Sequence, residues 1–136
     1  MSETRTPHWA DAVAQEVLHT HNHHLLSTGI TPSGEYHVGH LREVLTAEGV
    51  YRALRDHGAD CRLNYVADTM DPLRRVYTFL DPAVYQEHVG KPLCNIPCPC
   101  GAHQSYAEHF LVPFLEAMQT LGVTLEVLLA HELYRS

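Results

Sequence analysis

The segment between Leu25 and His57 constrains the fold more than any other part of this sequence. A short apolar run, Leu25 to Ile30, is followed by a loop of Thr, Pro, Ser and Gly, and then by a long amphipathic stretch that begins near His37. Gly58 lies where a glycine commonly ends a helix. The apolar residues of the long stretch follow helical spacing: Leu41, Val44, Leu45, Tyr51 and Leu54. We therefore predict a strand, a tight loop and a helix over about 37–57, with Tyr51 in the core.

The rest of the chain repeats this alternation. Further strands are predicted at 62–67 and 124–129. One helix is predicted to start at Thr6–Trp9 and to be broken by His21–His24, and another to run from the capping-box pattern Ser105–Glu108 to Gly122. The predicted fold class is α/β, a partial Rossmann-type doubly wound parallel sheet: the N-terminal half, with about three parallel strands and flanking helices. The ligand crevice of such folds lies beside the first strand, so we expect that strand to have an open edge. Six residues of the last long helix are predicted to be buried: Phe110, Leu111, Phe114, Leu115, Met118 and Leu121.

The composition limits the classes of function. With 9 basic and 16 acidic residues among 136, the net charge is −7, which argues against a stand-alone nucleic-acid-binding protein. The sequence shows neither a secretory signal nor an apolar run long enough to span a bilayer, so we expect a cytoplasmic protein without membrane contact. In that reducing compartment the four cysteines are expected as thiols or metal ligands.

The loop and the start of the predicted helix carry residues typical of a phosphate site. Pro32 and Gly34 favour a tight turn, and Gly39 would let a ligand approach the backbone. A helix start offers unpaired N–H groups and a positive dipole end to an anion. His37 and His40 add side-chain donors, which would stabilise charge on the phosphates during nucleotidyl transfer.

These residues resemble the signatures of a known family. His37-Val38-Gly39-His40 resembles the HIGH signature of class I aminoacyl-tRNA synthetases. The longer segment 27–43 is similar to the class I lysyl-tRNA synthetases. The resemblance covers nearly all of 8–135, and the other matching strings are His8–Asp11, Ala53–Asp56, Asp71–Arg75, Ser105–Phe110 and Glu132–Tyr134.

The resemblance implies a lysine–tRNA ligase, which activates lysine with ATP and Mg²⁺ and transfers it to lysine tRNA in the cytoplasm. It implies catalytic roles for His37 and His40. The residues implied to bind ATP are Pro32, Ser33, Gly34, His37, Val38, Gly39 and His40. Gly29 and Thr31 match the strand end and loop of the lysine pocket.

The chain departs from the family pattern at two points. Val38 replaces the isoleucine of the signature. The KMSKS signature that holds pyrophosphate, the second half of the fold and the anticodon-binding region have no counterpart in the sequence. We therefore expect residues 1–136 to form the N-terminal half of a class I catalytic domain, truncated before those parts, without the main tRNA-binding regions and with weak or no activity alone.

An acidic turn from Asp68 to Asp71 follows the second predicted strand and is expected at the ligand edge of the sheet. Asp68 is a candidate to bind lysine by pairing with its ammonium group. The alternative is a structural turn, or an ion pair between these carboxylates and Arg74 or Arg75. Glu132 follows the third strand on the same geometry, with a solvated surface role as its alternative.

A cysteine-rich loop supplies four candidate zinc ligands, Cys94, Cys98, Cys100 and His103. Their spacing, C-x3-C-x-C-x2-H, differs from a standard pair of CxxC knuckles. A proline-stiffened loop with unliganded thiols is therefore the alternative. A separate, His-rich tract lies within 8–24. It is either a solvated surface or an adventitious metal binder.

Two other functions stay open at this point. A small nucleotidyltransferase of the adenylyl- or cytidylyltransferase type also places HxGH after its first strand, but it needs a second phosphate-binding segment late in the sequence. A non-catalytic metal-binding or interaction module would use the cysteine loop and the open sheet edge.

Overall fold

The computed structural model describes residues 7–135, which fold around a three-stranded parallel sheet. Strands β1 (His23–Ile30), β2 (Asp60–Ala67) and β3 (Glu126–Leu129) lie in the order β1-β2-β3. Ile30 pairs with Ala67, and Ala67 pairs with Leu129, so the carboxyl ends of all three strands meet at one edge. The predicted α/β fold with half of a Rossmann-type sheet is confirmed.

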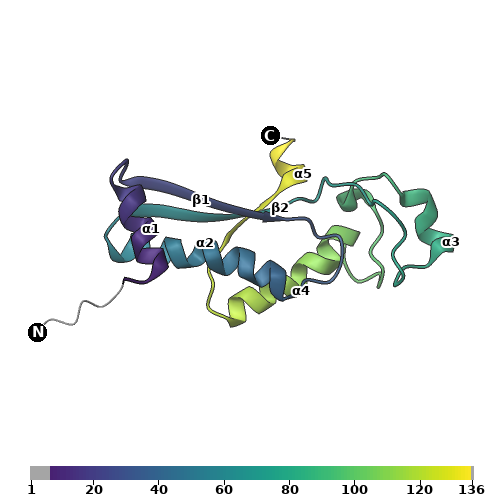
Figure 1. The fold of residues 1–136 in the computed structure, drawn as a ribbon. Coiled ribbons are helices and arrows are strands. Elements are labelled where there is room, and N and C mark those ends of the chain that lie inside the picture. Colours follow the sequence, from purple (N-terminus) through teal and green to yellow (C-terminus); the bar gives the residue numbers. More distant parts are fainter. Residues whose placement is uncertain (1–6, 136) are drawn as a thin grey trace, which may run out of the picture.

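Helices α2 (Val38–Asp56) and α4 (Tyr106–Thr120) cover one face of this sheet (Figure 1). Val44 of α2, Tyr65 of β2 and Phe114 of α4 pack together in the cluster beneath the strands, and all three are buried. The predicted bounds of α2 are correct to within one residue, because His37 caps its start and Gly58, with φ of 79°, follows its end.

Helix α1 (Trp9–Leu18) packs against the middle and end of α2. Ala10 and Ala14 of α1 are buried against Ala53 and Leu54 of α2. Small side chains on α1 allow the two helices to approach closely. This contact extends the helical layer without covering the opposite face of the sheet.

The segment between β2 and α4 is mostly irregular. It contains the short helices α3 (Pro82–Tyr85), η1 (Gln86–His88) and η2 (Leu93–Asn95). Its own apolar cluster joins it to the start of α4 and consists of Leu73, Leu80, Tyr85, Leu93, Ile96, Tyr106, Ala107 and Phe110. The segment is therefore held by side-chain packing where regular backbone pairing is scarce.

Four details differ from the sequence-based expectations. Leu121 is 55% exposed because it is the C-cap of α4 and points away from the core, so its predicted burial is wrong. Leu45 is also exposed, and Tyr51 is only half-buried, with its hydroxyl accepting a hydrogen bond from Arg55. The capping box of α4 is half formed: Ser105 accepts from the N–H of Glu108, whose carboxylate accepts from the N–H of residue 104.

The other face of the sheet and its β1 edge are uncovered. Leu25 of β1 is 64% exposed, and within residues 7–135 β1 pairs with β2 alone. The expected open edge beside the first strand is therefore present. No helix among the described residues is both long and apolar enough to cross a membrane. Helix α5 (Ala130–Leu133) follows β3 at the carboxyl edge.

Candidate functional site

The loop between β1 and α2 is fixed by three contacts to distant parts of the chain. Tyr106, at the start of α4, donates a hydrogen bond from its hydroxyl to the carbonyl of Ser33 over 2.7 Å. The hydroxyls of Tyr36 and Tyr65 lie 2.9 Å apart. Thr31 donates from its hydroxyl to a carboxylate oxygen of Asp71. The loop is therefore held in one conformation from both sides.

His37 and His40 cap the start of α2 reciprocally. Nδ1 of His37 accepts from the N–H of Gly39 at 3.1 Å, and Nδ1 of His40 accepts from the N–H of His37 at 2.9 Å. Their ring centroids are 3.9 Å apart. Because Nδ1 is an acceptor in both rings, the proton of each neutral ring is on Nε2. Neither Nε2 has a hydrogen-bond partner in the part of the chain described, so the two rings present a pair of N–H donors.

This arrangement changes the expected source of donors. The sequence predicts unpaired backbone N–H groups at the helix start, but the histidine side chains already bind the N–H groups of His37 and Gly39. Among residues 7–135, the imidazole Nε2–H groups are therefore the side-chain donors left free at this helix start. Burial, followed by repulsion from His37, lowers the pKa of His40, which favours its neutral form.

The two glycines of the predicted signature have different roles. A Cβ on Gly39 would lie 2.8 Å from Cε1 of His37, so Gly39 makes room for the capping ring. A Cβ on Gly34 would meet the Phe79 ring at 3.8 Å, an ordinary contact, and its φ is outside the left-handed region. Gly39 therefore serves the position of His37 in addition to any approach by a ligand.

The residues predicted to bind lysine lie at the carboxyl edge of β1 and β2. Gly29 pairs with Val66, whose carbonyl oxygen would be 3.2 Å from a Cβ on Gly29, so close strand packing by itself favours glycine there. Asp68 is half-buried, and its carboxylate has no hydrogen-bond or ion-pair partner among residues 7–135. Thr31 is engaged by Asp71.

Neither carboxylate of the acidic turn pairs with Arg74 or Arg75 among the described residues. Thr69, which lies between the two aspartates in the sequence, is buried and contacts His131. Its hydroxyl is 2.7 Å from Nδ1 of His131 and accepts a hydrogen bond from the backbone N–H of His131. This contact ties the turn to α5. Glu132 is exposed beside it and lines a cavity of about 640 Å³ with Thr69 and Cys94.

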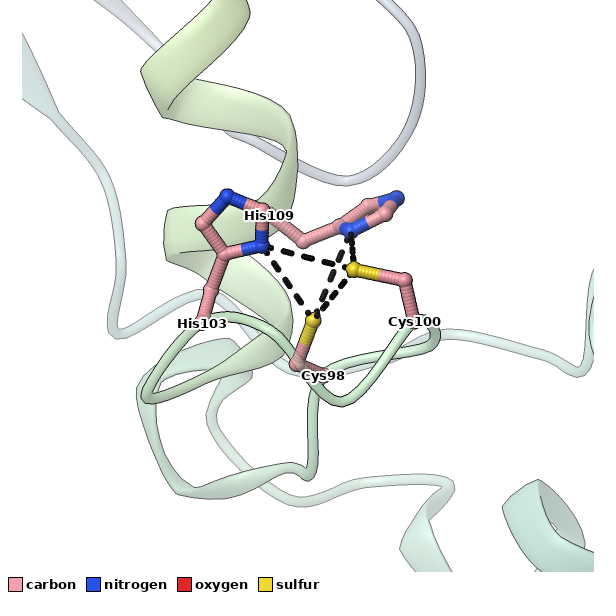
Figure 2. A group of neighbouring side chains, drawn as sticks. All are labelled: Cys98, Cys100, His103 and His109. Atoms are coloured by element: carbon pink, nitrogen blue, oxygen red, sulfur yellow. Dashed lines mark hydrogen bonds between the residues drawn. The ribbon is translucent and has the colours of Figure 1, made fainter.

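The structure brings together three of the four predicted metal ligands and replaces the fourth. Cys98, Cys100 and His103 converge with His109 of α4 (Figure 2), and their donor atoms all lie within 4.8 Å of one another. Cys94 lies apart, with its sulfur 3.9 Å from that of Met70. These four side chains are able to hold a metal ion. Sequence reasoning missed His109 because it is six residues beyond His103 and inside a helix.

One thiol of this group, that of Cys98, has a lowered pKa. Burial raises the pKa of the Cys98 thiol, but hydrogen bonds with His103 and Cys100 outweigh burial and bring it down to about 5. The lowered pKa favours the thiolate form of Cys98, which is the form that binds metals.

A largely apolar cleft connects the two groups of histidines. It has a volume of about 620 Å³ and runs between the start of α2 and α4. His37, His103 and His109 all line it, together with the aromatic rings of Phe110 and Phe114. Tyr36 stacks on Phe114 with ring centroids 4.1 Å apart, and burial raises its pKa to about 12, so it is neutral here.

Comparison with known proteins assigns the family. The family model described as tRNA synthetases class I (K) matches residues 7–136. The chain is 59% identical over 129 residues to "Lysine--tRNA ligase 1" of Methanosarcina acetivorans, covering 95% of this chain and 24% of the relative. It is 51% identical over 127 residues to "Lysine--tRNA ligase" of Archaeoglobus fulgidus, covering 93% and 26%.

A more distant relative agrees. "Lysine--tRNA ligase" of Methanocaldococcus jannaschii is 45% identical over 130 residues, covering 94% of this chain and 24% of the relative. The chain thus spans about a quarter of the length of the curated relatives it matches. Together with the parallel sheet and the histidine pair at its carboxyl edge, these matches show that the chain belongs to the class I (K) family of tRNA synthetases.

Proposed function

We propose that this chain supplies the ATP-binding part of a lysine–tRNA ligase that works in the cytoplasm. In this reaction the lysine carboxylate attacks the α-phosphate of ATP, pyrophosphate leaves, and the lysyl group then passes from the adenylate to lysine tRNA. The observation that carries the proposal is the His37–His40 pair near the carboxyl end of β1, whose Nε2–H groups are unpaired among residues 7–135. Class I synthetases use ATP with Mg²⁺ in general, and the proposed substrate is Mg²⁺·ATP.

The two imidazoles act by electrostatic stabilisation. Negative charge builds on the α-phosphate and on the departing pyrophosphate, and donors fixed in advance lower the barrier without reorganising. Reciprocal capping fixes both rings, because turning either ring breaks its bond to a backbone N–H. Pro32, Ser33, Gly34, Val38 and Gly39 form the surrounding ATP-binding segment in this proposal.

Lysine binds at the neighbouring strand ends in this proposal. The carboxylate of Asp68, which has no partner within the described part of the chain, faces the ammonium group, and Gly29 and Thr31 form the adjoining wall. Asp71 acts indirectly, because its carboxylate accepts a hydrogen bond from the Thr31 hydroxyl and so orients Thr31. The proposed lysine pocket is then completed at the open edge of β1.

The proposed domain assignment follows from the length of the match. Residues 1–136 form the N-terminal half of the catalytic domain, and contacts to pyrophosphate and to tRNA come from elsewhere in the enzyme. The net charge of −7 agrees with a tRNA-docking surface outside this segment. The names of the relatives favour this function over a small nucleotidyltransferase.

ATP binding by the chain tests the proposal. Isothermal titration and histidine ¹⁵N NMR with Mg²⁺·ATP should show binding that perturbs both Nε2 signals. The double variant His37→Ala/His40→Ala should lose it. His57→Ala is the matched control, because His57 caps the opposite end of α2 through its backbone. Absence of any ATP-dependent change in the wild-type chain would overturn the proposal.

A second measurement tests the division of the site. Lysine-dependent ATP–pyrophosphate exchange by the chain should be far slower than exchange by an intact synthetase, because contacts to pyrophosphate are lacking. An exchange rate equal to that of the intact enzyme would show that residues 1–136 hold a complete site.

A further inference from the structure

One arginine and two aromatic rings are stacked in the irregular segment that follows β2. The guanidinium carbon of Arg75 lies 5.3 Å from the centroid of the Tyr77 ring. The rings of Tyr77 and Phe79 are parallel to within 3°, with centroids 5.6 Å apart. We call these three side chains the stacking ladder. Tyr77 contacts both neighbours and is half-buried, whereas Arg75 is exposed and Phe79 is 55% exposed. Phe79 and Arg75 therefore keep surface available for a planar ligand.

The ladder lies beside the loop that is proposed to bind ATP. A Cβ on Gly34 would lie 3.8 Å from the Phe79 ring, so the ring and the loop are neighbours. Tyr77 packs against the apolar cluster that contains Tyr106, whose hydroxyl donates to the carbonyl of Ser33. Figure 1 shows this irregular segment beyond the carboxyl ends of β1 and β2, at the same end of the molecule as the loop. A ligand stacked on Phe79 would therefore lie next to the proposed phosphate site.

Three cationic side chains accompany the ladder without acidic partners. Arg74, Arg75 and Lys91 are all exposed, and none of them forms an ion pair with a carboxylate among residues 7–135. The ammonium group of Lys91 contacts only a ring nitrogen of His88. The N–H of Leu73 donates to the carbonyl of Lys91, which brings Lys91 beside the two arginines. In a chain with a net charge of −7, this local group of cations favours an anionic ligand.

A single-stranded RNA end is the ligand that uses all of these features. Exposed aromatic and guanidinium surfaces stack on unpaired bases, and cations neutralise successive phosphates. In the proposed reaction a hydroxyl of the terminal ribose of tRNA attacks the lysyl carbonyl, and AMP leaves with the hydroxyl proton. That ribose must reach the carbonyl next to the α-phosphate, so the last nucleotides must pass beside the loop before α2. A mononucleotide would use one ring and leave the other members of the ladder without a role.

We propose that the stacking ladder, together with Arg74 and Lys91, holds the unpaired 3′ end of tRNA beside the loop of residues 31–37. Stacking on Phe79 places the terminal nucleotide next to Gly34, and the cations bind the phosphates that precede it. This surface adds one RNA contact to those that come from elsewhere in the enzyme, and a few nucleotides need only a small basic surface. The identity of the RNA rests on the proposed function.

Fluorescence anisotropy with a labelled single-stranded RNA that ends in CCA-3′ tests the stacking contact on the chain itself. Phe79→Leu keeps an apolar side chain against Phe110 but removes the flat ring, so RNA affinity should fall roughly 5- to 100-fold. Tyr51→Leu and Arg55→Gln are the matched controls, because Arg55 lies 5.7 Å from the Tyr51 ring centroid in the half of α2 farther from the loop. Both controls should bind RNA like wild type. An equal loss in the controls would refute the assignment to Phe79.

The salt dependence of the same binding tests the phosphate contacts. Three neutralised phosphates on a single strand predict that log K falls with log salt with a slope of about −2. The triple variant Arg74→Gln/Arg75→Gln/Lys91→Gln should bring this slope close to zero. A complementary strand annealed over the CCA end should abolish binding, because paired bases cannot stack on the ladder. A duplex that binds as tightly as the single strand would show a nonspecific basic surface and overturn the proposal.

Titration of Mg²⁺·ATP into the same proteins separates this proposal from the proposed function. ATP binding without RNA binding by the wild-type chain would overturn the ladder and leave the ATP site in place. RNA binding without ATP binding would support the ladder and overturn the ATP site. A larger loss of ATP affinity than of RNA affinity in Phe79→Leu would assign the ring to the adenine of ATP and overturn the RNA contact.

NMR of the wild-type chain covers the case in which the variants fail to fold. The ring signals of Tyr77 and Phe79 should shift when the single-stranded RNA is added, and those of Tyr51 should not. Ring signals of Tyr77 and Phe79 that stay unchanged at millimolar RNA would overturn the proposal.

Discussion

Substitution of Gly39 by alanine sets two effects on α2 against each other. The added Cβ would lie 2.8 Å from Cε1 and 2.9 Å from Nδ1 of His37, closer than real contacts allow, so the ring must turn away. Loss of the cap costs about 1 kcal/mol of stability, while replacing a helical glycine with alanine gains up to about 1 kcal/mol. We therefore expect the free energy of unfolding to change by less than about 1 kcal/mol.

Ligand binding should respond much more strongly than stability. A hydrogen bond to a charged phosphate contributes about 1.5–3 kcal/mol, so displacing the Nε2–H donor of His37 should weaken ATP binding roughly 10- to 100-fold. Urea unfolding and isothermal titration measure the two quantities on the same sample. Gly49→Ala is the control: it lies in the same helix, and the atoms nearest its Cβ would be those of the Trp9 ring, at 3.3 Å, and of the Ala10 side chain. An affinity for ATP within about twofold of wild type in Gly39→Ala would refute the role given to His37.

Three further results are expected. Tyr106→Phe removes the hydrogen bond to the carbonyl of Ser33, so urea unfolding should show a loss of about 1 kcal/mol, and an unchanged midpoint would contradict that anchor. Thr31→Val should cost about 1.5–3 kcal/mol in the same assay because the carboxylate of Asp71 loses its donor; a neutral effect would mean that water replaces the hydroxyl. Burial and then a neighbouring charge lower the pKa of His40 from 6.5 in the folded state, so the unfolded chain takes up the proton first and stability falls as pH drops below about 6.5. An NMR titration midpoint for His40 at or above 6.5 would contradict that sign.

The sequence was sufficient to predict the helices and strands whose ends are marked by particular residues. The start and end of α2 were predictable because His37 and Gly58 mark them, and the sheet followed from alternation along the chain. The exposure of Leu121 was not predictable. Leu121 continues the helical spacing of the buried residues, but it is the C-cap of α4 and the last turn directs it to solvent.

The candidate sites show the same division. The position of the loop before α2 was predictable from its Pro and Gly residues, but its bonding was not. Nothing in the local sequence indicates that both imidazoles cap their own helix. His109 joins the cysteines only because α4 packs back onto the loop, and spacing along the chain does not carry that contact. A histidine one helical turn beyond Ser105, facing the cysteine loop, was the one signal available.

The bond between Tyr106 and Ser33 joins residues 73 positions apart, and this has a consequence for synthesis on the ribosome. At about 5–20 residues per second, roughly 4–15 s separate the addition of the two residues to the growing chain. The strand, the loop and α2 are all made before the phenol that fixes the Ser33 carbonyl exists. The loop proposed to bind the nucleotide is therefore expected to mature late, after α4 has been made. A pause in translation before residue 106 would prolong the interval in which this loop exists without its anchor at Ser33.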